Sequence, residues 1–330
     1  MKAAFINNTG SPDVIQYGDI PDPIVGPEDV LIRTGAVSVN PIDTYIRNGA
    51  NYWELPKPFV IGCDVAGTIA SVGSHVTRFS PGQRVWCTNQ GLMGRQGTFA
   101  ELCAVDQKWI YPTPDNVSDA DAAACALVGI TAHLGLFGRA RLQPNETVFV
   151  RGGAGGVGSM VLQMAKAAGA RVITTAGSEE KAAYCKQLGA DAVICYQNED
   201  VAAGVKAVAP QGVQVFWETL REPDFALAVD LLAERGRMVL MAGRDARPPF
   251  PVGPFSVKGL SLLGVVMFKA TAEEQAVAAG DINHWLASGK LKAVIDRVLP
   301  LSEAAEAHRL QEQHTIQKQS LLRGKLVLKP

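Results

Sequence analysis

The sequence predicts an α/β protein in which a compact, barrel-like all-β domain precedes a doubly wound parallel sheet. Short β segments punctuated by glycine and proline fill the chain up to about residue 120, which is typical of a small barrel. From residue 147 to residue 266 strands and helices alternate, as they do in a parallel sheet covered by helices on both faces. A glycine-rich turn joins the first strand of this second region to its first helix.

The first region contains strand-like segments at residues 2–6, 30–36, 60–72, 83–87 and 98–105. Ser118, with Asp121 three residues later, resembles a capping box that leads into a helix over residues 122–127. The most hydrophobic stretch, residues 122–138, is interrupted by glycine, threonine and histidine. We interpret it as buried helical segments near a site, because a membrane span needs about 20 largely apolar residues.

The second region is expected to alternate strands (147–151, 171–176, 192–196, 213–218, 237–242 and 260–266) with helices (156–168, 178–188, 200–208 and 225–233). Beyond Met267 the pattern predicts a helix (272–288), a strand (293–299), a helix (302–313) and a final strand (325–328), which need not extend the same sheet. We expect a first domain over residues 1–124, a second over 125–267, and a tail over 268–330 that returns to the first domain.

The glycine-rich turn carries the first functional signal. Gly153, Gly155 and Gly158 fit the pattern G-x-G-x-x-G, which provides a tight turn, close backbone approach to a pyrophosphate and close helix–strand packing. A glycine-rich surface turn is the simpler interpretation, but a second strand follows within the span of a βαβ unit. We therefore predict a Rossmann-type dinucleotide site, with phosphates at the start of the helix, formed by Gly153, Ala154, Gly155, Gly156, Val157 and Gly158.

The end of the second strand predicts NADPH rather than NADH as the cofactor. Sites that prefer NAD carry an acidic residue there to hold the ribose 2′-hydroxyl, whereas this strand ends in Ala176 and continues with Gly177 and Ser178. Ser178 and Lys181 supply a hydroxyl and a cation for a 2′-phosphate. Two glutamates between them, at positions 179 and 180, are expected to point to solvent from the first turn of a helix.

The composition narrows the class of protein. Lys and Arg total 31 against 32 Asp and Glu, a net charge of −1, so no basic field attracts nucleic acid or an anionic membrane. The 6 cysteines contain no C-x-x-C pair and are interpreted as buried free thiols in a reducing compartment. Because no N-terminal signal pattern is found either, we expect a cytoplasmic protein.

Further strings accompany the glycine turn in chain order: residues 40–49 (NPIDTYIRNG), 62–67 (GCDVAG), 97–101 (GTFAE), 128–132 (VGITA) and 175–181 (TAGSEEK). Together they resemble the zinc-independent quinone oxidoreductases, the zeta-crystallin-like branch of the medium-chain dehydrogenase/reductase superfamily. The resemblance covers nearly the whole chain. It implies a GroES-like, β-barrel-type catalytic domain followed by the Rossmann-type domain.

The chain departs from the zinc-dependent relatives at the metal site. Those relatives have a cysteine in the place of Asn40, a Gly-His-Glu triplet in the place of Gly62-Cys63-Asp64, and a lobe of four closely spaced cysteines; none of these occurs in this sequence. Zinc requires three or four convergent ligands, and we expect Cys63 and Asp64 to be isolated and the histidines dispersed. The resemblance therefore implies no catalytic metal.

The resemblance also implies roles for individual residues. Asn40 and Tyr45 match positions that line the nicotinamide cleft, and the Tyr45 hydroxyl is a candidate donor to a substrate carbonyl. The simpler alternatives are a turn residue before a proline for Asn40 and the edge of the core for Tyr45. Thr131 would touch the nicotinamide, unless its hydroxyl only starts a helix. The remaining implied contacts are Tyr196, Ala242, Gly243, Arg244 and Val266 with the cofactor, and Tyr52, Trp53, Asn89, Met93 and Arg95 with the substrate.

The implied reaction is hydride transfer from NADPH to a quinone, for which the protein supplies proximity, a dry cleft and neutral donors. The same scaffold resembles reductases of enones, alkenals and acyl thioesters. Some zeta-crystallin relatives are instead structural or RNA-associated, an alternative that the neutral charge disfavours. Residues 259–267, a hydrophobic strand candidate at the end of the sheet, further suggest a homodimer, unless the chain's own tail covers them.

Overall fold

The computed structural model describes residues 1–50, 53–319 and 322–330. The chain folds into two compact units. The first unit comprises residues 1–127 and 270–330, and the second comprises residues 128–269. These boundaries lie within three residues of those expected from the sequence.

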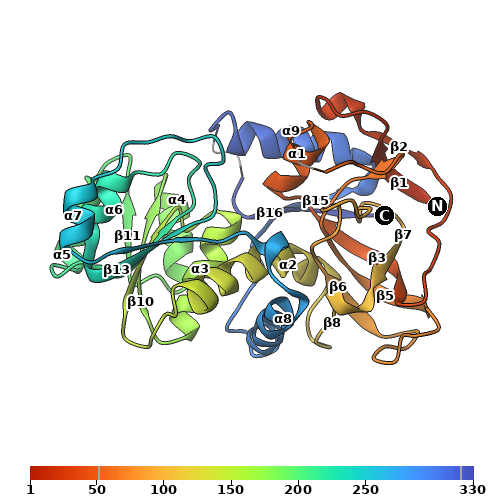
Figure 1. Ribbon diagram of the computed structural model, residues 1–330, viewed down its shortest axis with the longest axis horizontal. Helices are drawn as coiled ribbons and strands as arrows, with labels where there is room; N and C mark the ends of the chain where they lie inside the picture. The colour runs from red at the N-terminus through yellow and green to blue at the C-terminus, as the bar shows by residue number, and fades with distance from the viewer. Residues whose placement is uncertain (51–52, 320–321) are drawn as a thin grey trace. The chain divides into compact units, whose positions relative to one another are not determined.

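Among the residues that the structure describes, the first unit contains two β-sheets and three α-helices that lie wholly within it (Figure 1). The larger sheet has the strand order β15-β16-β3-β5-β6-β8, with β7 also paired to β3, and the smaller has the order β2-β1-β4. The strands are β1 (Lys2–Ile6), β2 (Gln16–Asp19), β3 (Asp29–Ser38), β4 (Phe59–Val60), β5 (Asp64–Val72), β6 (Arg84–Cys87), β7 (Leu102–Asp106), β8 (Ile110–Pro112), β15 (Ile295–Pro300) and β16 (Lys325–Lys329). The helices are α1 (Pro41–Arg47), α8 (Ala272–Ala287) and α9 (Ala304–Thr315).

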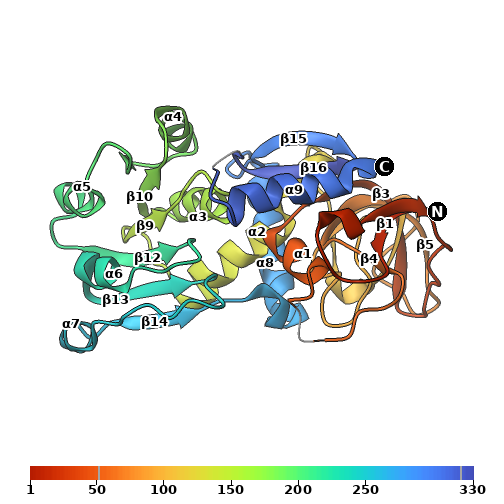
Figure 2. The same ribbon diagram turned by 90° about the horizontal axis from the view of Figure 1, so that it is seen from above.

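The tail belongs to the first unit. Strand β16 pairs antiparallel with β3, where Val327 lies opposite Ser38, and β15 pairs parallel with β16. Figure 2 shows β15 and β16 in blue beside the red-brown β3, so the tail extends the larger sheet of the first unit. All side chains of β16 are buried except that of Lys329, and the last residues of the chain therefore form part of this unit's core.

Helix α1 is not predicted by the sequence pattern. It has only seven residues, too few for helical apolar spacing to be distinguished from noise. Asn40 precedes it in an extended conformation, and Pro41 occupies its first turn, where a missing N–H costs nothing. Asp43 then accepts a hydrogen bond from the Asn40 backbone N–H at 2.7 Å and stabilises the start of the helix.

The second unit contains a six-stranded parallel sheet in the order β11-β10-β9-β12-β13-β14, which confirms the α/β, doubly wound fold class. Figure 1 shows α3 on one face of this sheet and α5, α6 and α7 on the other. The strands are β9 (Thr147–Arg151), β10 (Arg171–Ala176), β11 (Ala192–Cys195), β12 (Val213–Glu218), β13 (Leu232–Leu240) and β14 (Ser261–Gly264). The helices are α3 (Gly156–Ala167), α4 (Glu179–Gln187), α5 (Val201–Val208), α6 (Phe225–Leu231) and α7 (Val252–Val257).

Helix α2 (Asp119–His133) and the π-helical turn that follows it, residues 134–139, form one continuous apolar segment. By length and composition this segment is a candidate membrane span, but 78% of its apolar stretch is buried inside the protein. The core helix of a globular protein has the same properties. Ser118 precedes α2, and its hydroxyl accepts a hydrogen bond from the Asp121 backbone N–H at 3.1 Å, as the capping pattern predicts.

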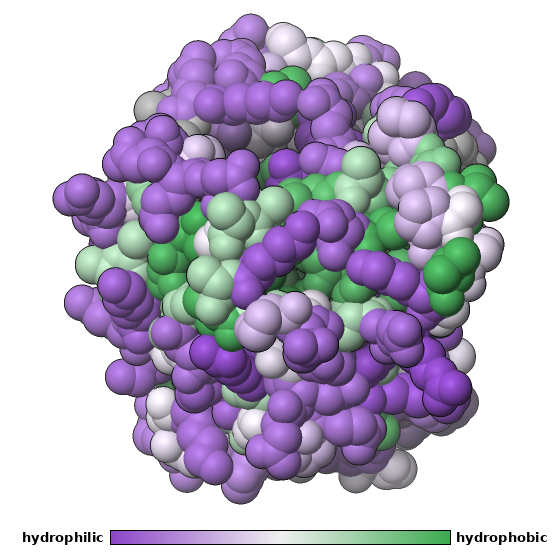
Figure 3. Space-filling model, turned by 90° about the vertical axis from the view of Figure 1, so that its left-hand side faces the viewer, coloured by the Kyte–Doolittle hydropathy of each residue, from purple (hydrophilic) through white to green (hydrophobic). Residues whose placement is uncertain are grey.

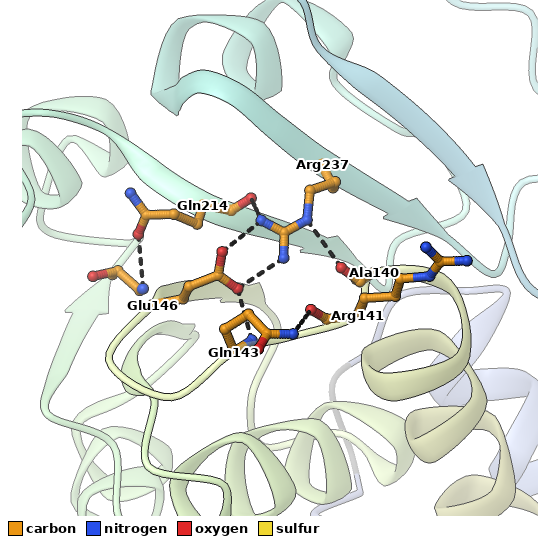
Figure 4. Close-up of polar contacts among 7 residues, drawn as sticks. Ala140, Arg141, Gln143, Glu146, Gln214 and Arg237 are labelled. Carbon is orange, nitrogen blue, oxygen red and sulfur yellow. Dashed lines mark hydrogen bonds and ion pairs between the residues drawn. The ribbon is translucent and has the colours of Figure 1, made fainter.

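An ion pair fixes the loop that leads into β9 (Figure 4). The Arg237 guanidinium on β13 binds both carboxylate oxygens of Glu146, at 2.8 and 2.7 Å, and donates to the Ala140 carbonyl at 3.0 Å. Gln214 on β12 binds the backbone N–H of Thr147 at 2.8 Å. The amino ends of β9 and β12 are thus tied to each other and to β13, which helps to set the register of β9 and of the glycine turn beyond it.

Candidate functional site

The residues expected to form the site fall into both units, so each half is described separately. In the second unit, β9 ends at Arg151 and α3 begins at Gly156, with the glycine turn between them. Gly152 donates its N–H to the Thr175 hydroxyl at 2.9 Å, which ties the turn to the end of β10. No side chain caps the first turn of α3, so its N–H groups are suited to receive phosphate oxygens.

Packing explains why glycines are required in this turn. A Cβ on Gly153 would lie 2.3 Å from the Thr174 hydroxyl, and one on Gly158 would lie 2.1 Å from the Gly152 carbonyl oxygen. Both distances are far below van der Waals contact. A Cβ on Gly155, by contrast, would meet nothing closer than 3.5 Å, so that position is open toward the space a ligand would use. The turn therefore fits a bound dinucleotide.

The turn also lies where open α/β sheets bind ligands. From β9 the chain continues to β10 and β11 on one side, and the sheet then grows from β12 on the other side. The crevice at the carboxyl ends of β9 and β12 is therefore the topological switch point of this sheet.

The end of β10 carries no carboxylate that could hold a ribose 2′-hydroxyl. Ser178 caps α4, accepting a hydrogen bond from the Lys181 backbone N–H at 3.2 Å. Glu179 and Glu180 are exposed. A Cβ on Gly177 would lie 2.3 Å from the Tyr196 hydroxyl, so these two residues are in direct contact.

The other residues expected to contact the cofactor lie in different parts of the second unit. Ala242, Gly243 and Arg244 lie in the loop that follows β13, and Gly243 has a left-handed φ of 87°, as a tight turn near a strand end requires. Val266 follows β14 and is 45% exposed. Thr131 lies in the interior of α2 and is buried, so its hydroxyl does not start a helix.

In the first unit, Asn40 is at the centre of a buried polar cluster. Its amide nitrogen donates to Asp64 at 2.7 Å, and its amide oxygen accepts from the Lys325 ammonium group. Lys325 also donates to the Val39 carbonyl at 2.7 Å. The Asp64 carboxylate accepts further bonds, from Ser38 at 2.8 Å and from Thr88 at 2.6 Å.

This arrangement adds contacts that the sequence alone does not predict. Asp64 accepts a hydrogen bond from Asn40, and the buried Cys63 thiol lowers the pKa of Asp43, yet among the described residues these side chains do not form a set of metal ligands. The Asn40 side chain, moreover, is not a free donor: both of its polar atoms are already engaged within the cluster. Asn40 is better suited to hold Pro41 and α1 in place than to polarise a substrate.

Burial dominates the electrostatics of the cluster. It raises the pKa of Asp43 to about 7, against the opposing effect of the Cys63 thiol, and raises the pKa of Asp64 against the opposing effect of Lys325. Burial also lowers the pKa of Lys325, opposed by Asp64, and raises the pKa of Cys63 well above its usual value. Lys325 is thus the cation that balances the buried carboxylates.

The cluster does not suit a zinc ion. Zinc binds thiolates, neutral imidazoles and carboxylates, whereas Cys63 retains its proton and Lys325 places a positive charge among the acidic groups. Across residues 1–50, 53–319 and 322–330, no group of three or more His, Cys, Asp or Glu side chains is arranged to hold a metal.

Tyr45 lies on α1 and is partly buried. Among the loop residues expected to line the substrate pocket, Asn89 is buried, and Arg95 donates to its carbonyl oxygen at 2.6 Å and to its side chain at 3.1 Å. Met93 is half exposed, and Tyr52 lies outside the described residues. Asn89 and Arg95 therefore stabilise their own loop.

Two polar groupings were missed by sequence reasoning. Lys325 is 285 residues from Asn40, and no local pattern links them. An ion pair between Arg151 and Glu218, at 2.9 Å, joins the ends of β9 and β12. The sequence did contain a signal for this pair, since each residue is a charge that ends an otherwise apolar strand.

The chain matches two protein families: the alcohol dehydrogenase GroES-like domain over residues 26–115 and the zinc-binding dehydrogenase family over residues 156–280. The quinone oxidoreductase of Mus musculus is 34% identical over 314 residues, covering 93% of each chain. Prostaglandin reductase-3 of Mus musculus is 32% identical over 286 residues, covering 86% of this chain and 71% of that protein.

Solved structures agree with this relationship. A crystal structure of an NAD-dependent alcohol dehydrogenase superimposes with a TM-score of 0.90 at 30% identity, covering 100% of both chains. Escherichia coli quinone oxidoreductase complexed with NADPH superimposes with a TM-score of 0.85 at 27% identity, again covering 100% of both chains. The chain therefore belongs to the quinone oxidoreductase branch of the medium-chain dehydrogenase/reductase superfamily and is an oxidoreductase.

Proposed function

We propose that this protein reduces quinones with NADPH by direct hydride transfer, without zinc. The glycine turn at the switch point, followed by a β10 end without a carboxylate, is the observation that supports NADPH most directly. Similarity to quinone oxidoreductases over 93% of the chain supports the acceptor. The E. coli relative that binds NADPH has the same fold.

The proposed cofactor site uses residues of the second unit. The N–H groups in the first turn of α3 bind the pyrophosphate, and the hydroxyl of Ser178 and the ammonium of Lys181 bind the 2′-phosphate. Gly177 and Tyr196 lie against the adenosine part of the cofactor, and Thr131 contacts the nicotinamide. Residues 242–244 and Val266 complete the contacts. When bound, NADPH supplies the hydride.

The first unit supplies a neutral environment for the acceptor. The Tyr45 hydroxyl donates a hydrogen bond to the acceptor oxygen on which charge develops, and α1 holds it in position through Asn40 and Asp43. Without a metal acting as a Lewis acid, the transition state for reduction of an unactivated ketone would lose several kcal/mol of charge stabilisation. A quinone needs less help because its reduced anion is delocalised and aromatic. This difference favours quinones as substrates.

The experiment that tests this proposal is NADPH oxidation by the purified protein after exhaustive chelation. We expect quinone reduction to survive chelation unchanged and alcohol oxidation with NADP⁺ to be negligible. The same protein reloaded with zinc serves as the matched control. Activity that disappears on chelation and returns with zinc would refute the zinc-independent mechanism. NADPH binding without reduction of any quinone or enone would refute the reaction.

Reduction of α,β-unsaturated carbonyls, whether enones, alkenals or acyl thioesters, is the second candidate, supported by the similarity to prostaglandin reductase-3. The two acceptor classes require the same hydride donor and differ in the shape of the acceptor. A panel of quinones, enones and acyl thioesters, compared by kcat/KM, separates them. RNA binding at physiological salt, without NADPH oxidation, would instead indicate a non-enzymatic protein.

We further propose that the protein forms a homodimer through β14. This strand pairs only with β13 among the described strands, so one of its edges remains open. Leu262 on β14 is 41% exposed, and Val257, the last residue of α7, is 88% exposed. Figure 3 shows apolar side chains interrupting the polar surface on a face of the second unit. A single 35 kDa species in sedimentation at micromolar concentration would refute the dimer.

A reducing, cytoplasmic location is consistent with the cysteines. All 6 are free and buried in the described structure, and none is placed to form a disulfide. Fractionation of the producing cells tests this location; recovery of the protein in an oxidising compartment would contradict it.

A further inference from the structure

An arginine and a glutamate form an ion pair across the switch point of the second unit. Arg151 is the last residue of β9, Glu218 is the last residue of β12, and the two lie opposite each other in register. The Arg151 Nη1 donates to Glu218 Oε2 at 2.9 Å. Because β9 and β12 border the switch point, this pair lies at the edge of the sheet where α/β proteins bind their ligands.

The two partners differ in exposure. The Glu218 side chain is 0% exposed, whereas the Arg151 side chain is 23% exposed. The second carboxylate oxygen of Glu218 accepts the backbone N–H of Leu220 at 2.9 Å, so the carboxylate is held from two sides. A buried carboxylate that lost its cation would be strongly destabilised, which keeps the guanidinium in place.

Arg151 has hydrogen-bonding capacity to spare. Among the residues that the structure describes, its guanidinium donates only through Nη1, to Glu218. The N–H groups on Nε and Nη2 are therefore available to a ligand. A guanidinium held by a buried anchor loses little side-chain entropy on binding, and its planar fork matches the oxygens of a phosphate.

The main chain of Arg151 is anchored as well. Its carbonyl oxygen accepts the hydroxyl of Thr219, and the next residue, Gly152, donates to Thr175. Arg151 thus directly precedes the glycine turn and is held rigidly by neighbouring strands. A ligand that places phosphates on the turn would bring them close to this cation.

We propose that Arg151 is a further cofactor-binding residue, which donates to a phosphate of the dinucleotide from its anchor on Glu218. The proposal rests on the dinucleotide binding in the proposed function and is independent of the acceptor. The phosphate belongs either to the pyrophosphate, which NADPH and NADH share, or to the 2′-phosphate of NADPH. Proximity to the glycine turn favours the pyrophosphate.

The test is direct titration of NADPH and NADH into the purified protein without an acceptor. Arg151→Gln removes the charge and keeps an amide that can donate hydrogen bonds, and Arg151→Lys keeps the charge. We expect Arg151→Gln to weaken binding by about 10- to 100-fold, the usual effect of one charge-assisted hydrogen bond, and Arg151→Lys to weaken it less. Arg171→Ala, which removes an exposed arginine at the amino end of β10, is the matched control and should leave both dissociation constants unchanged.

The outcomes distinguish the possible roles. Equal losses for NADPH and NADH assign Arg151 to the pyrophosphate, and a loss confined to NADPH assigns it to the 2′-phosphate. If folded Arg151→Gln protein binds both cofactors as tightly as the wild type, the pair is structural only and the proposal is wrong. If the wild-type protein binds neither cofactor, both the proposed function and this inference are wrong. The wild-type titration alone shows this, whereas failure of the inference alone appears only in the comparison with Arg151→Gln.

Discussion

Replacing Lys325 by methionine should destabilise the first unit more than any other single lysine replacement in it. The ammonium group donates to Val39 and Asn40 and is the cation that balances Asp64 and Asp43. Methionine keeps the length of the side chain but removes the charge and both hydrogen bonds. A buried acceptor that loses its donor costs about 1–3 kcal/mol, and Lys325→Met leaves two such acceptors, on Val39 and Asn40. We therefore expect the free energy of unfolding to fall by about 2–6 kcal/mol.

The effect should depend on pH. Without Lys325 the buried Asp64 carboxylate has no balancing cation, so its pKa rises further above its value in the unfolded chain. An acid whose pKa is higher in the folded state binds more protons there, so stability falls as pH rises through that range, by about 1.4 kcal/mol per unit. Lys325→Met should therefore be more destabilised at pH 8 than at pH 5, relative to the wild type.

Urea unfolding followed by tryptophan fluorescence is a suitable assay because four of the 5 tryptophans, Trp53, Trp86, Trp109 and Trp285, belong to the first unit. Lys329→Met, on the same strand but exposed, is the matched control and should change little. Adding Asp64→Asn to Lys325→Met should recover part of the loss because it removes the unbalanced charge. Strict additivity of the two substitutions, or a loss below about 1 kcal/mol for Lys325→Met alone, would show that the two charges are not coupled.

Three further outcomes are expected. Lys181→Ala should weaken NADPH about tenfold or more and leave NADH nearly unchanged, because it removes a charge-assisted contact to the 2′-phosphate; equal losses in titrations of the two cofactors would contradict this. Tyr45→Phe should lower the turnover of quinone reduction by about 10- to 100-fold if its hydroxyl stabilises the acceptor oxygen, whereas an unchanged kcat would make Tyr45 a pocket wall. His308 is buried with no hydrogen-bond partner on either ring nitrogen among the described residues, and burial lowers its pKa to about 3. The unfolded chain therefore binds more protons than the folded one between pH 6.5 and 3, and stability falls as the pH falls through that range. His308→Leu should flatten this acid limb in urea titrations, and an unchanged slope would exclude His308 as its cause.

The sheet of the second unit could be predicted closely because its strands are apolar runs between strong punctuation. The predicted and observed limits of β9, β10 and β12 are identical. Strand β13 differs, since it begins at Leu232, five residues before the predicted start, where charged and glycine residues interrupt the apolar pattern. Of these five residues Glu234 and Arg235 are exposed and Gly236 is buried, so the strand start shows no regular alternation of buried and exposed positions.

The polar cluster of the first unit could not be predicted in the same way, for a physical reason. A hydrophobic strand is recognised by a local repeat of apolar residues. Asn40, Asp64 and Lys325 are single polar residues far apart in the sequence, and Lys325 comes into contact with Asn40 only because β16 pairs with β3. Judged locally, Asp64 is an isolated acid and Lys325 the start of an ordinary final strand. Buried charged groups are tolerated only when each has a hydrogen-bond or charge partner. The tail supplies one of these partners, so the cluster helps to determine where the tail docks, although no local sequence pattern predicts it. The tail carries the cation, and the first unit is electrostatically incomplete without it.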